Sequence, residues 1–135
     1  MNWSLLLKLS AFGIVMSIAT INFIPFEFEF VVWLFVYGFC AYSISKSCQD
    51  RFFVHGFLLG IINTIFYSAF HLAFFESYTS AHTLLMNQVN TIVPAPANQR
   101  PIVLAIGVVM CILGALLQGL ICHFVSKKMQ KPVAV

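Results

Sequence analysis

Charged residues are scarce in this sequence, and their scarcity limits the kind of protein that it can be. Only 8% of the 135 residues are charged, whereas 61% are hydrophobic. A soluble domain carries about 25% charged residues, enough to cover its surface in water. We therefore expect the lipid bilayer to be the solvent of most of this chain. No pattern of basic residues suggests that nucleic acid is a partner.

The sequence also lacks the residue patterns of common metal and redox sites. Its four cysteines form no C-x-x-C pair, which makes a thiol–disulfide enzyme or a zinc ribbon an unfavourable interpretation. Buried cysteine usually acts as a small apolar side chain, and we expect that role here. There is no convincing pair of nucleophile and base either, so we expect no enzyme, no cofactor and no metal. The cysteines are Cys40, Cys48, Cys111 and Cys122.

Long apolar runs, by contrast, are abundant. A helix that spans a bilayer needs about 20 mainly apolar residues, and four segments reach or approach that length. They predict an all-α, polytopic integral membrane protein in which four transmembrane helices form an antiparallel bundle. A chain of 135 residues predicts a single domain over residues 1–135. The predicted spans cover residues 5–23, 28–44, 53–75 and 102–125.

The first apolar segment allows a second interpretation. Ser17, Ile18 and Ala19 form a small-x-small pattern, as at the cleavage site of a secretory signal peptide. However, only Lys8 precedes the apolar core, and the leucines at positions 5–7 lie on the wrong side of it. A spanning helix is the favoured interpretation.

The short connections carry capping signals. Pro25 suits the start of the second helix, and Glu27 and Glu29 then fall in the first turn, where the helix dipole favours anions. We interpret the sequence FEFEF as this charge complement within an interfacial belt of aromatic residues, and a carboxylate ion site as the less favoured alternative. Ser47 and Asp50 are candidate caps of the third helix.

The third connection is the longest and predicts an amphipathic helix in the loop between the third and fourth spans. Its apolar positions recur at spacings of three and four residues, which is the period of a helix with one apolar face. Such a helix continues the third span or lies along the membrane interface. The proline-rich sequence PAPANQRP then ends it. The apolar positions are Tyr78, Ala81, Leu85, Val89 and Ile92.

Positive charges predict the orientation in the membrane. With four spans, both termini and the second connection share one side, and that side holds every basic residue except Arg100. The positive-inside rule then places both termini in the cytoplasm and the long third connection outside, for a multi-pass protein of the cell (inner) membrane. The basic residues of the cytoplasmic side are Lys8, Lys46, Arg51, Lys127, Lys128 and Lys131.

The third and fourth spans each have one face of small and polar residues. At about 100° per residue, these residues of the third span fall within an arc of about 100°, and those of the fourth span within about 80°. Small residues permit close helix approach and amides can hydrogen-bond across a helix contact, so we expect the two faces to pack together. The first face holds Gly56, Gly60, Asn63, Tyr67, His71, Tyr78 and His82; the second holds Gly107, Cys111, Gly114, Gln118 and Cys122.

His71 is the residue with the greatest functional interest. An ionisable group inside a membrane is costly, so it is a functional candidate by default, although a neutral imidazole can also serve packing through one hydrogen bond. Glu76 lies about 7.5 Å further out along the helix, and we expect Glu76 and His82 to be reached by water. No second histidine faces His71 at the same depth, which argues against a haem site.

Two hypotheses of function remain open. The first is a structural or interaction subunit, which packs with copies of itself or with partner membrane proteins. The second is a small oligomeric transporter or channel, in which Asn63, Tyr67, His71 and Gln118 line a polar path. The glycines and Cys111 would then serve helix packing in both cases.

Overall fold

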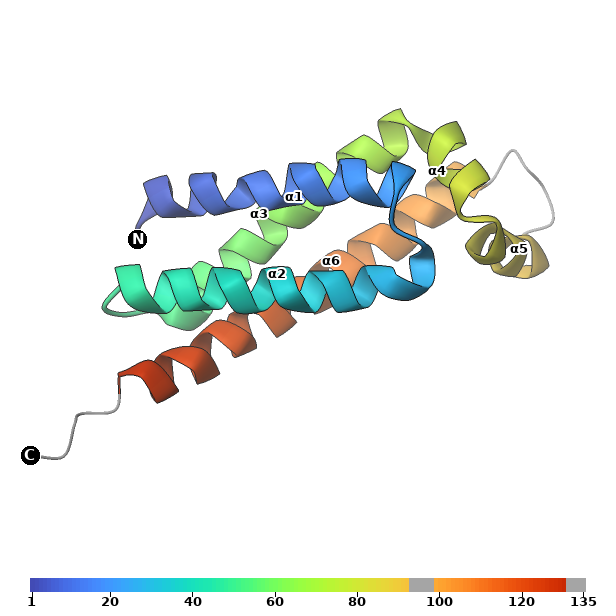
Figure 1. Ribbon diagram of the computed structural model, residues 1–135. Helices are drawn as coiled ribbons and strands as arrows, with labels where there is room; N and C mark the ends of the chain where they lie inside the picture. The colour runs from blue at the N-terminus through green and yellow to red at the C-terminus, as the bar shows by residue number, and fades with distance from the viewer. Residues whose placement is uncertain (93–98, 131–135) are drawn as a thin grey trace, which may run out of the picture.

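The computed structural model describes residues 1–92 and 99–130, and no strand occurs in these two ranges. The expected all-α fold is confirmed. Four long helices and two short ones follow one another along the chain (Figure 1). They are α1 (Trp3–Asn22), α2 (Phe26–Ser47), α3 (Phe52–Ala73), α4 (Phe75–Ala81), α5 (Thr83–Ile92) and α6 (Gln99–Met129).

The four long helices are long and apolar enough to cross a membrane. Their candidate spans agree with the predicted ones to within a few residues at most ends. The largest difference is at the end of the last helix, which continues through the basic pair Lys127 and Lys128 to Met129. Basic side chains in the last turn complement the negative end of the helix dipole, so the helix has no reason to stop at the edge of the apolar run.

The most extensive contact joins α3 and α6. The backbones approach so closely that a Cβ atom at Gly60 would lie 2.5 Å from the Cα atom of Ala115. One turn earlier in α3, a Cβ atom at Gly56 would lie 2.6 Å from the sulfur of Cys122, which is later in α6. The two helices therefore run in opposite directions where they cross.

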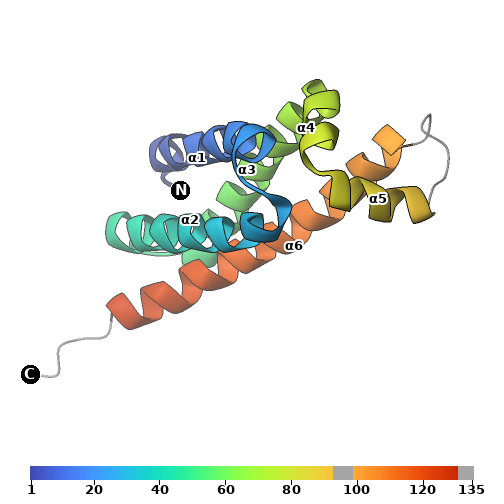
Figure 2. The same cartoon turned by 45° about the vertical axis from the view of Figure 1, so that its right-hand side comes forward.

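Helix α1 lies against α3 and runs in the same direction. Gly13 faces Asn63, where a Cβ atom on the glycine would lie 2.8 Å from the asparagine Cα atom. Further along both helices, the Thr20 hydroxyl and His71 Nε2 are hydrogen-bonded at 3.1 Å. Helix α2 packs mainly on α6. The start of α1 and the end of α6 lie at one end of the molecule, which we call the terminal end, and α4 and α5 lie at the other, the cap end (Figures 1 and 2).

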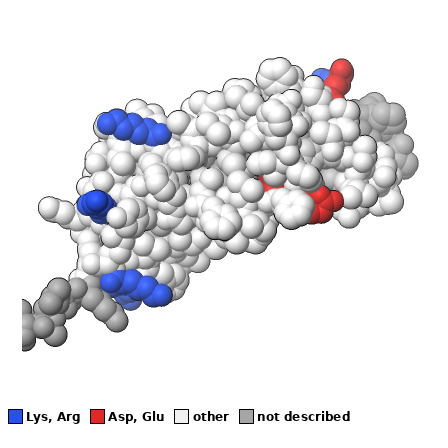
Figure 3. Space-filling model, in the orientation of Figure 1, with Lys and Arg blue, Asp and Glu red and all other residues white. Residues whose placement is uncertain are grey.

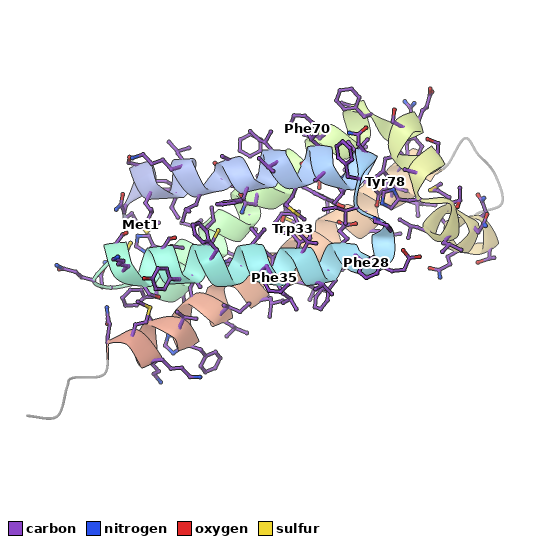
Figure 4. The ribbon with its side chains drawn as sticks, viewed as in Figure 1. Met1, Phe28, Trp33, Phe35, Phe70 and Tyr78 are labelled. Atoms are coloured by element: carbon purple, nitrogen blue, oxygen red, sulfur yellow. The ribbon has the colours of Figure 1, made fainter. Side chains whose placement is uncertain are left out.

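Apolar side chains occupy both the interior and the outer surface of the long helices. The interior cluster at the terminal end includes Leu6, Ile44 and Leu59, none of which is exposed. In contrast, Phe35 is 75% exposed and projects away from the other helices, as Figure 4 shows. A soluble protein rarely exposes a continuous apolar surface of this extent.

The start of α3 differs from the prediction of its caps. The N-cap residue is Arg51, which has a left-handed backbone (φ 52°) and no capping side-chain hydrogen bond. Ser47 instead ends α2, and Asp50 lies beside the side chain of Arg51 at 3.7 Å. The prediction of Ser47 or Asp50 as a cap was therefore wrong. The Arg51 carbonyl accepts a ring N–H of His55, so a histidine further along α3 binds the group at its start.

The predicted amphipathic helix is divided into α4 and α5, which meet at His82. The buried face also differs from the predicted one: Tyr78 and Val89 are buried as expected, but Ala81 is exposed. His82, which we expected to be reached by water, is only 3% exposed, so that prediction was wrong. Because the helix is interrupted after Ala81, α5 is turned relative to α4. His82 is therefore buried in place of Ala81. Leu85 is half-buried, the side chain of Ile92 is outside the described set, and the predicted linker falls largely on residues 93–98, also outside it.

Charged side chains separate along the length of the molecule. Lysines gather at the terminal end, and the acidic side chains visible on the same face lie toward the cap end (Figure 3). At the cap end Glu76 pairs with Arg100 at 3.8 Å, and both side chains are well exposed. The long apolar surface between the two ends carries almost no charge.

Candidate functional site

Polar and aromatic side chains from four helices meet at the cap end, and we call this group the polar cluster. Its centre is His71, which is 5% exposed. The ring of His71 lies between two tyrosine rings, with centroids 3.8 Å from Tyr67 and 4.1 Å from Tyr78. The polar cluster consists of Thr20, Glu29, Trp33, Tyr67, His71, Tyr78 and His82.

The first helix contributes a hydrogen bond to this cluster. His71 Nε2 and the Thr20 hydroxyl are 3.1 Å apart, and Thr20 is buried. The hydroxyl also lies 2.9 Å from the carbonyl oxygen of Met16, its own helix neighbour. Because an imidazole nitrogen is costly to bury without a partner, this bond stabilises both the position of His71 and the pairing of α1 with α3.

The second helix contributes a carboxylate. The Tyr67 hydroxyl donates a hydrogen bond to Glu29 Oε1, which links α3 to the first turn of α2. The ring of Trp33 lies one turn further along α2 and contacts the Tyr67 ring edge to face, at 5.8 Å between centroids. Glu29 is therefore half-buried among aromatic rings, whereas its neighbour Glu27 is exposed.

Helix α4 contributes a second tyrosine, on the side of the cluster that faces the cap end. Tyr78 is buried, and its ring stacks on His82 with 4.2 Å between centroids. Figure 4 shows Tyr78 toward this end of the molecule and Trp33 nearer its middle, between α1 and α2. Burial raises the pKa of Tyr78 to about 12, with a smaller contribution from the nearby Glu29 carboxylate. The phenol therefore stays protonated at every physiological pH.

His82 completes the row of alternating tyrosine and histidine rings. Its Nδ1 lies 2.9 Å from the carbonyl oxygen of Tyr78, which can only accept, so Nδ1 carries the proton. The cluster thus gathers one carboxylate and two imidazoles around the rings of Tyr67 and Tyr78.

Of the four residues predicted to line a polar path, only Tyr67 and His71 belong to the polar cluster. Asn63 is 1% exposed and lies where α1 crosses α3, against Gly13. Neither of its amide atoms has a hydrogen-bond partner among the described residues. Gln118 faces a different neighbour, α2, where its amide donates to the Tyr37 carbonyl at 3.3 Å.

The residues predicted to serve helix packing divide between two contacts. Gly56 and Gly60 lie at the close approach of α3 to α6. Gly114 instead faces α2, with a Cβ position 2.8 Å from the Tyr37 hydroxyl, and Cys111 is within electrostatic range of the same tyrosine. Gly107 has more space, because a Cβ atom there would meet only the Ser68 hydroxyl at 3.6 Å.

Sequence reasoning missed three members of the cluster. Glu29 was assigned to the helix dipole, with a carboxylate ion site as the less favoured alternative, and Thr20 and Trp33 were not singled out. A helical projection of α2 would have placed Glu29 and Trp33 on one face, since they are four residues apart. Nothing in the order of the residues indicates that this face meets Tyr67, which is 38 positions away.

A second polar group lies at the terminal end. His55 is 2% exposed and uses both ring nitrogens: Nδ1 donates to the Arg51 carbonyl at 2.9 Å, and Nε2 accepts the Asn2 backbone N–H at 3.1 Å. This pattern requires a neutral imidazole. A shallow, open pocket of about 480 Å³ lies beside it, lined in part by Trp3, Cys48 and Asp50.

No family model, curated protein sequence or solved structure matches this chain. Within the described residues, no three His, Cys, Asp or Glu side chains converge to hold a metal ion.

Proposed function

We propose that this chain is a multi-pass integral membrane protein, a single domain whose four long helices form an antiparallel bundle across the bilayer. The observation that supports this most directly is the outward-facing apolar surface of helices that are each long enough to span the hydrocarbon layer. Polar side chains such as His71 and Gln118 are turned inward instead, which is the arrangement that lipid favours.

The proposed orientation has the terminal end in the cytoplasm of a cell (inner) membrane. Basic side chains concentrate at that end, as Figure 3 illustrates, and the positive-inside rule favours the cytoplasm for them. The cap end, with α4 and α5, then faces the outside. The exposed pair of Glu76 and Arg100 is compatible with the headgroup region there.

Impermeant thiol labelling of intact cells tests this orientation. Because Cys48 is buried, its failure to react would carry no information, so exposed positions serve better. In a chain without its native cysteines, Gln49→Cys should remain unlabelled and Asn87→Cys should react. Both positions are exposed, at opposite ends of the molecule. Labelling of Gln49→Cys alone would reverse the orientation, and labelling of both would contradict a four-span topology.

The molecular role that we propose is non-enzymatic: a structural or interaction subunit that packs with itself or with a partner membrane protein. Support comes from the ionisable groups of the interior, which hydrogen-bond and stack on one another and leave the long apolar faces of α2 and α6 for packing. Native mass spectrometry from bilayer nanodiscs should find a complex larger than one chain. A monomer alone, together with no crosslinked neighbour in native membranes, would contradict this role.

A small oligomeric transporter or channel is the second candidate, and the polar cluster is the observation that favours it. Tyr67, His71 and Glu29 form a connected group of ionisable side chains within the bundle. Asn63 lies two turns away from His71 along the same helix, and Gln118 comes from α6. For these polar residues to line one path, several copies of the chain would have to place them around a common axis.

Proteoliposomes separate the two candidates. A transporter should show a pH-dependent flux that is lost in His71→Gln while the variant stays folded. Gln at position 71 keeps one hydrogen-bonding group for Thr20, so folding is expected to survive. Absence of a flux in the wild type would leave the interaction subunit as the better proposal, whereas a flux that is unchanged in His71→Gln would exclude His71 from the transport path.

A further inference from the structure

The four acidic residues of the chain differ in how their charges are balanced. Two of them pair with an arginine at the surface, Asp50 at 3.7 Å and Glu76 at 3.8 Å. Glu27 is exposed to solvent. Glu29 is the exception, because it is half-buried and forms no ion pair with any residue that the structure describes. A charge that is partly withdrawn from water is costly without a counter-charge.

The groups beside the Glu29 carboxylate are neutral and aromatic. Its Oε1 atom accepts a hydrogen bond from the Tyr67 hydroxyl. The Trp33 ring lies one helical turn further along α2, and its centroid is 5.8 Å from that of Tyr67 and 5.4 Å from that of Tyr37. The negative charge therefore lies beside a row of aromatic rings, whose faces attract cations.

We propose that Glu29, Trp33 and Tyr67 form a binding site for an organic ammonium group. The carboxylate supplies the counter-charge. An ammonium group bound to it lies within reach of both rings, where cation–π attraction adds to the binding. This inference goes beyond the proposed roles, because such a site can be occupied in an interaction subunit as well as in a transporter.

The composition of the site selects among cations. In the part of the chain that the structure describes, no three His, Cys, Asp or Glu side chains converge to hold a metal ion. One carboxylate and one phenol also provide few of the six or more oxygen ligands that Ca²⁺ and Mg²⁺ take. Aromatic rings, by contrast, are recurring partners of quaternary ammonium groups. The site therefore favours an organic cation.

The position of the site indicates two sources for this group. Glu29 is in the first turn of α2, at the cap end, and the proposed membrane insertion places that turn at the level of the lipid headgroups (Figure 1). The choline or ethanolamine headgroup of a phospholipid carries an ammonium group, and so does a free amine in water. Only the lipid source rests on the proposed insertion, because binding of a free amine can be measured in detergent.

The test is a titration of the full chain with choline in a maltoside detergent, whose headgroup carries no ammonium. The indole ¹H–¹⁵N NMR signals of the two tryptophans report binding, since Trp33 belongs to the site and Trp3 begins α1 at the terminal end. The Trp33 signal should shift saturably and the Trp3 signal should not. Glu29→Gln should weaken binding by about tenfold or more. Glu27→Gln removes a charge from the same helical turn, and should weaken binding by less than about twofold.

A neutral analogue keeps the test decisive if Glu29→Gln does not fold. The alcohol in which a tert-butyl group replaces the trimethylammonium group of choline has the same shape without the charge. It should bind the wild type about tenfold more weakly or worse. The proposal is wrong if choline leaves the Trp33 signal unchanged, or if the alcohol or sodium ions shift it as strongly as choline does. It is equally wrong if folded Glu29→Gln retains the affinity of the wild type.

Nanodiscs distinguish the two sources of the ammonium group. If the lipid headgroup is the ligand, the Trp33 signal is at its bound position in phosphatidylcholine before any choline is added. In phosphatidylglycerol nanodiscs it should reach that position only on addition of choline. A need for added choline in both lipids would identify a free amine as the ligand and retain the site. None of these measurements reports topology, flux or oligomeric state, so failure here is distinguishable from failure of the proposed function.

Discussion

At the scale of single residues, the interior polar side chains differ in whether they have a hydrogen-bond partner. His71 has Thr20 as a hydrogen-bond partner and two aromatic rings around it. Asn63 is equally buried, yet neither of its amide atoms is paired among the described residues. A buried polar group without a partner costs about 1–3 kcal/mol, so substitutions at these sites should have opposite effects on stability.

Thr20→Val should lower the free energy of unfolding by about 1–3 kcal/mol, because it leaves His71 Nε2 without its partner at nearly unchanged volume. Asn63→Leu should be neutral or stabilising, since it removes an unpaired amide from the interior. Thermal melting in detergent, followed by circular dichroism, measures both variants. The assignment of the two environments fails if Asn63→Leu is the more damaging substitution.

Tyr78 links stability to pH. Its folded-state pKa of about 12 is above the ordinary value of 10, so the folded state binds the phenolic proton more tightly than the unfolded state does. Its contribution to stability is complete below pH 10 and is lost as the pH rises through 12. Between these values the wild type should lose more stability than Tyr78→Phe. Denaturation series at several alkaline pH values measure this difference, and parallel curves would contradict the burial of the phenol.

At the scale of secondary-structure elements, glycine has opposite roles in α2 and α3. Gly60 lies where α3 meets α6, and a Cβ atom there would come within 2.5 Å of the Ala115 backbone. Gly38 in α2 has no atom within 4 Å of its Cβ position. The same substitution should therefore damage one helix contact and leave the other helix unharmed.

Gly60→Ala should destabilise the protein by about 1–3 kcal/mol, because the added methyl group overpacks the contact of α3 with α6. Gly38→Ala should be neutral or stabilise by up to about 1 kcal/mol, because alanine is the better helix former. Melting temperatures of the two variants in the same detergent give the comparison. Equal tolerance at both positions would mean that α3 and α6 are not in backbone contact.

The cap shows how a local pattern can indicate a helix but not its buried face. Periodicity predicted an amphipathic helix after the third span, and α4 and α5 are both helical. The helix is interrupted at His82, where this side chain turns inward and stacks on Tyr78. That stacking partner belongs to the preceding turn, but the space that receives both rings is made by other helices.

At the scale of the whole molecule, the order in space differs from the order in sequence. Helix α1 packs on α3 more extensively than on α2, its neighbour in the chain, and α2 packs chiefly on α6. The polar cluster depends on this arrangement, because Thr20 reaches His71 only if α1 lies along α3 in the same direction.

Crosslinking tests the pairing of α3 with α6. Ser68→Cys combined with Gly107→Cys should form an intramolecular disulfide, since the Cβ position at 107 is 3.6 Å from the Ser68 side-chain oxygen. In a chain without native cysteines, Ser68→Cys with Gly38→Cys is the control and should remain reduced. Mass spectrometry after alkylation counts the free thiols. Oxidation of the control pair alone would overturn the arrangement of the helices.

The sequence by itself determined the class of element and its length. Apolar runs of about 20 residues with few charges specify helices. In apolar surroundings the backbone N–H and C=O groups must pair within the segment, and a helix pairs them all along its length. The positions of the four long helices therefore followed from composition and periodicity. The inward face of α3, with Asn63 and His71, followed as well, since residues three and four apart share one face.

Only the tertiary structure decided which faces meet. The partners of Tyr67, His71 and Gln118 lie 38, 51 and 81 residues away, and helical periodicity contains no information over such distances. Close approach at small residues selects among the alternative pairings, and it placed α1 beside α3 and Gly114 beside α2. For the same reason Glu29 could be predicted at a helix start, but its place in the polar cluster could not: that depends on how whole helices pack.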